Sequence, residues 1–384
     1  MIDENSLDRP GIVAAAAATG TAAVIVFALL PVLSGALADH FKLDDVETGL
    51  VATSYFSVYA LIALTSAAWI RRFDWVKTAR VGFGIMVLGL IITLLASSFT
   101  MSSVGLSMVG AGAGLLFPIS LTLVSDMERT DRAYAIKMCV EQLVPASLLF
   151  LLSSSLFAGF GLRTTLVALL GVVVACFFVS RQLPAHGNEA KHIAGEANGK
   201  PHLGIASLVG LGLGFAGFAG LWAFLERIAV DNQFEAGFTT TWLAVGLITS
   251  GIGPLGGAIL EDRVGRTLPL IVATLVAVAT LFLLGETTSK TAFAIVLTLL
   301  PLSYYFSLCY AFSVVAEADH NGKIAGLMSF SLAIGAGAGP ALFGWIKATD
   351  GPVVLVMGLL ILSGSTLIIW IQTRLTQVSH GAST

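Results

Sequence analysis

The chain has 384 residues, of which 56 % are hydrophobic and 11 % charged, with a formal net charge of −3 and a mean hydropathy of +0.91. A soluble domain is about a quarter charged, so this composition excludes an ordinary soluble protein. The apolar runs instead predict helices of about 20 residues that cross a bilayer. The sequence lacks the short alternating segments of a membrane β-barrel.

Twelve apolar runs follow one another along the chain and predict an all-α membrane protein with twelve transmembrane helices. The six expected in the first half are Gly11–Ser34, Glu47–Trp69, Arg80–Ser97, Ser102–Val124, Ile136–Phe157 and Gly161–Ser180. The six expected in the second half are Gly204–Leu225, Thr239–Leu260, Thr267–Gly285, Ala292–Val315, Ile324–Trp345 and Pro352–Thr373. An even number of spans places both termini on the same side.

The distribution of basic residues predicts which side that is. Fifteen of the 20 Lys and Arg residues fall on the side of the termini and five on the other. Cytoplasmic loops carry the excess of Lys and Arg, so we expect cytoplasmic termini in a bacterial-type inner (plasma) membrane. The first residues, MIDEN, are acidic, and the first apolar run is long, so we expect no cleaved signal peptide.

A polar break divides the chain into two nearly equal parts. The stretch Arg181–His202 has no apolar period and reads as a cytoplasmic linker. We therefore expect a six-helix bundle over residues 1–180, a linker over 181–203 and a second bundle over 204–384. The loop after the second helix is highly charged in both parts, at Ala68–Arg80 and Ala258–Thr267, which indicates a duplication. Parallel repeats of this kind are typical of transporters whose site lies between the halves.

One loop carries a specific resemblance. The sequence Asp262-Arg263-Val264-Gly265-Arg266 resembles the cytoplasmic loop signature of the major facilitator superfamily, and it falls between the eighth and ninth helices, where that family has it. The resemblance implies a gating corner at Asp262, Arg263, Gly265 and Arg266, with Arg72 in the equivalent loop of the first half. The fourth helix has only the glycine part of the signature of proton-linked drug exporters, because Leu106 and Val109 replace its Arg and Gln.

Ionisable residues inside spans are costly and are functional candidates by default. Glu141, with Gln142 beside it, is a candidate for a proton or solute site; the alternative is an ion pair with Lys137 on the cytoplasmic rim. Glu226 and Arg227 end the seventh helix. Trp222 lies one turn before Glu226 on the same face, so these residues are expected to line the outer cavity or to form an interfacial belt. For the proton site we rank Glu226 before Glu141.

Polar residues also follow one face of the tenth helix. We expect this stripe to line the cavity, with Tyr304 and Tyr305 flanking it; its members are Ser303, Ser307, Tyr310 and Glu317. Glu317 has the alternative of belonging to the following inner loop. Tyr55 and Tyr59, one turn apart in the second helix, are further candidates.

The remaining motifs indicate no enzyme. Gly212–Gly217 matches the dinucleotide pattern G-x-G-x-x-G, but it lies in a transmembrane run with no preceding strand, so its glycines indicate helix packing. No P-loop or HExxH sequence occurs, and the three cysteines lie inside spans without metal-ligand spacing. We expect no cofactor, no metal and no nucleic-acid partner.

The sequence therefore predicts a monomeric secondary transporter of a small organic solute in a lipid bilayer, working by alternating access and driven by protons. Two directions compete: efflux of a drug-like amphipathic compound by antiport, and uptake of a metabolite such as an organic acid by symport. A membrane scaffold or receptor without transport activity is the alternative of a different class.

Overall fold

The computed structural model describes residues 7–43, 45–153, 161–187, 201–285, 289–319, 323–349 and 351–381, and all regular structure in these ranges is helical. The first half contains α1 (Pro10–Ala28), α2 (Leu30–Phe41), α3 (Asp45–Leu64), α4 (Ser66–Trp69), α5 (Trp75–Leu94), α6 (Phe99–Ser125), α7 (Thr130–Ser153), α8 (Gly161–Val179) and the short 3₁₀ helix η1 (Ser180–Gln182). The second half contains α10 (Pro201–Asp231), α11 (Ala236–Val264), α12 (Thr267–Gly285), α13 (Lys290–Glu317), α14 (Ile324–Ala348) and α15 (Val353–Gly381).

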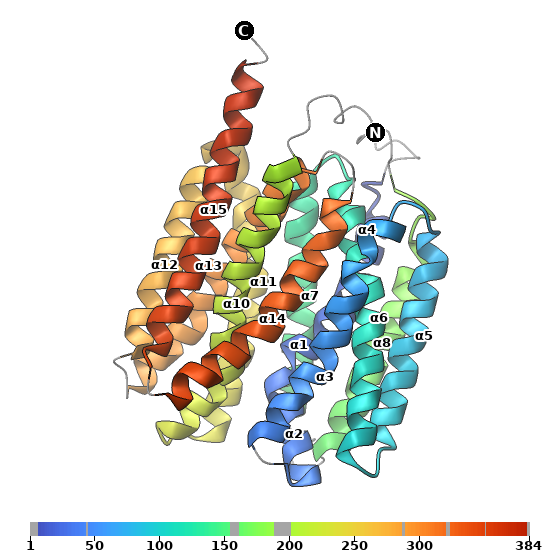
Figure 1. Ribbon diagram of the computed structural model, residues 1–384, viewed down its shortest axis with the longest axis vertical. Coiled ribbons are helices and arrows are strands. Elements are labelled where there is room, and N and C mark those ends of the chain that lie inside the picture. The colour runs from blue at the N-terminus through green and yellow to red at the C-terminus, as the bar shows by residue number, and fades with distance from the viewer. Residues whose placement is uncertain are drawn as a thin grey trace.

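The helices form two bundles that lie side by side. Figure 1 shows α1 to α8 in one bundle and α10 to α15 in the other, with α3 and α14 adjacent where the bundles meet. Among the described residues, eleven helices are long and apolar enough to cross a membrane, and the 20-residue helix α3 completes the twelve-helix bundle. The start of α1 and the end of α15 lie at the same end of the molecule, called the terminal end below.

The first predicted span is two helices rather than one. Helix α1 ends at Ala28, and α2 begins at Leu30 with Pro31 in its first turn. Proline has no backbone N–H to continue a helical hydrogen-bond ladder, so the chain is free to change direction here. The break leaves Phe27 in the last turn of α1.

The fifth helix begins earlier than the sequence predicts. The apolar run predicts a start at Ile136, whereas α7 starts at Thr130. Glu141 consequently lies near the middle of a 24-residue helix and not near its start. The interpretation of Glu141 as a residue of the cytoplasmic rim is therefore wrong in its position, although its pairing with Lys137 is present.

Local signals define the helix ends at the terminal side. The Asp74 carboxylate accepts a hydrogen bond of 3.0 Å from the Lys77 backbone N–H at the start of α5, which lowers the pKa of Asp74. Gly265 has φ of +67°, a left-handed conformation that glycine adopts readily, and it makes the turn between α11 and α12.

The glycines of the dinucleotide-like run serve packing. A Cβ on Gly217 would lie 2.6 Å from the Met357 carbonyl oxygen of α15, and one on Gly212 would lie 2.9 Å from Ser331 Oγ of α14. Only the absence of a side chain lets α10 approach both neighbours this closely.

Candidate functional site: a cavity between the two halves

A cavity of about 50 Å³ lies between the bundles. The first half supplies side chains from α1, α3, α6 and α7, and the second half supplies them from α10, α13 and α14. The lining residues are Ala23, Val24, Phe27, Phe56, Tyr59, Phe117, Met138, Glu141, Gln142, Phe215, Tyr305, Leu308, Phe312, Leu332, Ala333 and Ala336.

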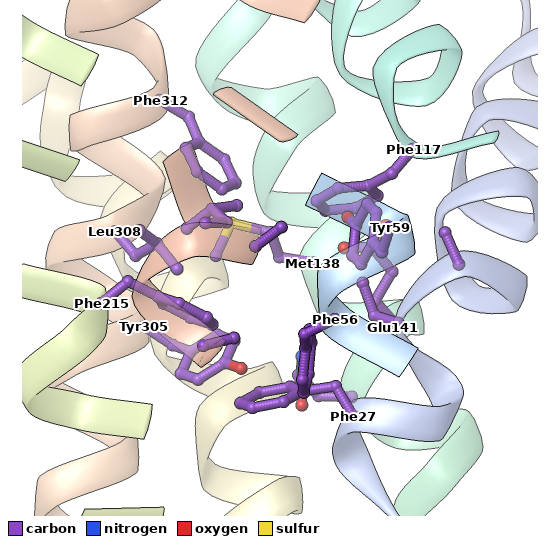
Figure 2. Close-up of a pocket in the computed structure, with 16 residues that line it drawn as sticks. Phe27, Phe56, Tyr59, Phe117, Met138, Glu141, Phe215, Tyr305, Leu308 and Phe312 are labelled. Atoms are coloured by element: carbon purple, nitrogen blue, oxygen red, sulfur yellow. The ribbon is translucent and has the colours of Figure 1, made fainter. Parts of the chain in front are cut away.

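Aromatic rings from both halves enclose the cavity. Figure 2 shows Phe215, Tyr305 and Phe312 facing Phe27 and Phe56 across it. The rings of Phe27 and Phe215 are in contact across the halves, with centroids 5.4 Å apart. Because α1 runs from the terminal end and Phe27 lies at its last turn, this contact borders the cavity on the side away from the termini.

A buried ion pair adjoins the cavity. Lys137 donates to Glu141 Oε1 over 2.5 Å, one turn away on α7, and their side chains are 0 % and 4 % exposed. Glu141 faces the cavity, whereas Lys137 lies behind it, with Nζ 4.5 Å from the centroid of the Phe117 ring. Two charges out of water carry a large desolvation penalty, which their mutual attraction must offset.

The backbone of α1 makes room for this carboxylate. A Cβ on Gly20 would overlap Glu141 Oε1 and would lie 2.8 Å from Ser120 Oγ. Ser120 in turn donates to the Ala16 carbonyl oxygen over 2.7 Å. The Glu141 carboxylate is thus held between α1 and Lys137.

The cavity has few other polar groups among the described residues. Ser329 of α14 donates to the Tyr59 hydroxyl over 3.2 Å, which joins the two halves. Gln142 is 4 % exposed, and its Oε1 has no hydrogen-bond partner. Its side chain lies against the hydroxyl of Tyr305.

A smaller cavity, called the side pocket below, adjoins the first. Its lining includes Gln142 and Tyr305, which it shares with the central cavity, together with Phe218, Trp222 and Ser250. Trp222 is 4 % exposed, and its indole N–H has no hydrogen-bond partner. A donor and an acceptor without hydrogen-bond partners therefore belong to two residues that line one pocket.

Other candidates from the sequence lie away from the central cavity. The Tyr55 hydroxyl donates to Ala23 O over 2.9 Å, and Tyr310 donates to Gly257 O over 2.7 Å, so both fasten helices within one half. Ser303 donates to carbonyls of its own helix. Tyr304 stacks on Phe218 and, with Ser307, lines a separate small pocket inside the second half.

The structure describes the backbone but not the side chains of four candidates. They are Glu226, Arg227, Asp262 and Arg263. Their backbones belong to α10 and α11.

The expected gating corner contains a cluster of charges that joins the halves. Arg266 Nη2 lies 2.8 Å from Asp131 Oδ2 at the start of α7, and Arg266 Nη1 lies 2.5 Å from Glu317 Oε2 at the end of α13. In the first half it is Arg71 that pairs with a carboxylate, Asp126, over 2.6 and 2.8 Å. Arg72, the predicted member, is exposed.

The sequence reading missed several lining residues. Phe27, Phe56, Phe215 and Met138 are apolar residues in apolar helices, so no local pattern separates them from lipid-facing or core positions. Tyr305 was noticed only as a flank of the serine stripe. Within the described residues no group of three His, Cys, Asp or Glu side chains could hold a metal ion.

Comparisons with known proteins agree with this architecture. The sequence model of the Major Facilitator Superfamily matches residues 15–340. The fucose:proton symporter FucP of E. coli, in a variant form, has a TM-score of 0.65 at 14 % identity, with 92 % of this chain and 98 % of that chain covered. FucP in the outward conformation gives 0.68 at 15 % identity, with 95 % and 99 % covered.

The human organic anion transporter MFSD10 (TETRAN) gives a TM-score of 0.71 at 18 % identity, with 94 % of this chain and all 100 % of that chain covered. These identities establish the shared fold alone. No curated protein sequence matches the chain. The family match spans most of the sequence, and the helices, the two bundles and the cavity between them fit it. The chain therefore belongs to the major facilitator superfamily, as an integral membrane transporter and not an enzyme.

Proposed function

We propose that this protein is a proton-coupled secondary transporter of a small, mostly apolar organic solute, and that Glu141 binds the proton. The observation that carries the proposal is the Glu141–Lys137 pair, which borders the cavity between the halves. A carboxylate at this place can respond both to a proton and to the occupant of the cavity.

The pair supplies a physical means of coupling. Protonation of Glu141 removes the charge that Lys137 faces, and the protonated carboxyl becomes a donor that can hydrogen-bond a solute. The energetic consequence is large, because a buried charge without its partner is strongly unfavourable. Lys137 would then need a new partner or a new position, and this favours a change in how α7 packs.

Alternating access requires that each end of the cavity can be closed. At the terminal end the Arg266 cluster and the Ser329–Tyr59 hydrogen bond join the halves. At the other end the Phe27–Phe215 contact does so. We propose that rocking of the bundles breaks one set of contacts while the other forms.

The chemistry of the lining favours an uncharged solute. FucP is named as a fucose:proton symporter and MFSD10 as an organic anion transporter. A sugar needs many hydrogen-bonding partners, and an anion needs a cation that is free to pair with it. The described lining is largely aromatic and aliphatic, and Lys137 is already paired. Both directions of transport, symport uptake and antiport efflux, are compatible with one titrating carboxylate.

The test is the Glu141→Gln variant in proteoliposomes, with a solute first identified by thermal-shift screening of the purified protein. Glutamine mimics the protonated carboxyl, so accumulation driven by a pH gradient should be lost while solute counterflow persists. Glu235→Gln is the matched control, because Glu235 is exposed beside Lys290 and far from the cavity.

Unchanged pH-driven accumulation in Glu141→Gln would remove the role from Glu141. Glu226, ranked first from the sequence, would then be tested by the same substitution. If both variants accumulate solute normally, coupling through either carboxylate is rejected.

A further inference from the structure

The side pocket offers two buried polar atoms that no protein group satisfies. Trp222 Nε1 carries a hydrogen to donate, and Gln142 Oε1 can accept one. Both residues line the side pocket, and both are at least nine-tenths buried. A buried polar group without a partner costs about 1–3 kcal/mol, so two in one pocket point to an occupant that satisfies them.

The neighbours of both side chains hold them in place. The Trp222 ring stacks on Phe218, with centroids 6.1 Å apart and planes at 16°, and Phe218 stacks in turn on Tyr304 at 4.4 Å. The Gln142 side chain lies against the Tyr305 hydroxyl. The donor and the acceptor are therefore preorganised by packing and do not depend on a flexible loop.

The pair of atoms selects a ligand chemistry. The occupant must accept from an indole N–H and donate to an amide oxygen. A carboxylate cannot donate, and an ammonium group cannot accept. An uncharged hydroxyl or carboxamide does both. The side pocket opens beside the aromatic central cavity, which suits the apolar part of the same molecule.

We propose that the side pocket binds the polar head of the transported solute, an uncharged hydroxyl or carboxamide, while an apolar ring system occupies the central cavity. This inference rests on the proposed transport function and adds the class of solute to it. Gln142 comes from the first half and Trp222 from the second, so a solute that bridges them also favours the state in which the two halves meet around it.

The test compares three ligands that share one ring system: naphthol, its methyl ether and methylnaphthalene. The same alcohol, ether and hydrocarbon are also tested on a one-ring and on a three-ring system, so that ring size is varied separately from the polar group. The ether oxygen can accept but not donate, and the methyl group does neither. Binding is measured by calorimetry on the full-length protein in detergent. The wild type should prefer the alcohol to the ether and the ether to the hydrocarbon, each by about tenfold, as the loss of one buried hydrogen bond implies.

Each of two variants should remove one of these two differences in affinity, alcohol over ether or ether over hydrocarbon. Gln142→Met should abolish the preference for alcohol over ether, and Trp222→Phe should abolish the preference for ether over hydrocarbon. Neither should weaken binding of the hydrocarbon more than about twofold, because about the same apolar surface remains. The matched controls are Gln372→Met and Trp242→Phe, two residues that line neither the central cavity nor the side pocket.

Two outcomes would overturn the inference. The first is that the wild-type protein binds the three ligands of a set equally, or binds no ligand of any set. The second is that the variants show the same ligand preferences as the wild type. The second result would mean that water, and not the solute, satisfies the two atoms. The proposed transport function fails by a different observation, pH-driven accumulation that is indifferent to Glu141→Gln and Glu226→Gln, so the two failures can be told apart.

Discussion

At the residue scale, the proposed coupling mechanism depends on the Glu141–Lys137 ion pair. Both side chains are almost fully enclosed, and the pair lies in the middle of α7, where water is scarce. A buried ion pair contributes little net stability compared with a well-packed apolar pair, but removal of one partner alone is costly. The presence of this ion pair beside the central cavity therefore points to a role in function more than in stability.

The free-energy cost of removing one partner of the pair can be measured by unfolding the protein. Lys137→Met should lower the free energy of unfolding by about 3–5 kcal/mol, because it leaves the Glu141 carboxylate buried without a partner. The double variant Lys137→Met with Glu141→Gln should recover most of that loss. Denaturant unfolding in detergent checks both. A single variant as stable as the wild type would mean that Glu141 is already neutral in the folded state.

Gly20 tests whether the position of the carboxylate matters apart from its charge. Gly20→Ala places a methyl group where Glu141 Oε1 now lies, so the carboxylate must move away from α1. We expect pH-driven accumulation to fall by about tenfold or more while the protein still folds. Gly84→Ala on α5, where a Cβ meets nothing within 4 Å, is the control. Equal accumulation in the two variants would show that this contact is not needed for coupling.

At the scale of elements, the two halves repeat one corner. The loop after α4 supplies Arg71 to Asp126 at the end of α6, and the loop after α11 supplies Arg266 to Glu317 at the end of α13. The second corner also reaches across to the other half, at Asp131 of α7, and so joins the two bundles.

The Arg266 contacts should stabilise closure of the terminal end. In this structure the start of α14 lies against α4 and α6, since a Cβ on Gly326 would be 3.2 Å from Ser66 Oγ. Arg266→Gln should raise the rate at which a cysteine at Ser66 reacts with a maleimide by about fivefold, as expected from about 1 kcal/mol for partly exposed ion pairs. The background carries no native cysteines.

Arg72→Gln, an exposed arginine in the equivalent loop, is the control and should leave the rate unchanged. A rate in Arg266→Gln equal to that of the control would show that the cluster does not hold this end closed.

The sequence predicts the positions of the helices well and the residues of the cavity poorly. Long apolar runs locate the helices, because length and hydropathy are local properties. The break at Pro31 and the early start of α7 were missed, since polar residues from Thr130 onward hide a helix that extends beyond the apolar run. Of the predicted site residues, Glu141, Gln142 and Tyr59 line the central cavity and Trp222 lines the side pocket, and each is chemically unusual for a membrane span. Which aromatic residues face the cavity depends on the packing of two bundles, and no local pattern carries that information.

At the scale of the whole molecule, the proposed alternating access requires two arrangements of the same bundles. The cavity is bordered by cross-bundle contacts on both sides, the Arg266 cluster toward the termini and the Phe27–Phe215 rings on the other side. A solute that satisfies groups from both bundles can be bound while neither end is open. This is the intermediate that alternating access needs between its two open states.

The distribution of Lys and Arg residues predicts the orientation of the protein in the membrane. The loops expected from the sequence assign 15 of the 20 Lys and Arg residues to the side of the termini. Lys137, one of the 15, is buried inside α7, but the excess of the others still predicts that the terminal end faces the cytoplasm. In a background without native cysteines, Gly195→Cys in the linker should react with a membrane-impermeant maleimide only after the cells are permeabilised. Ser289→Cys, at an exposed position directly before α13 at the opposite end, should react in intact cells. The comparison is internal, because both variants use one reagent and one background. The reverse pattern of labelling would place the termini outside and would require a different force than loop charge to orient the chain.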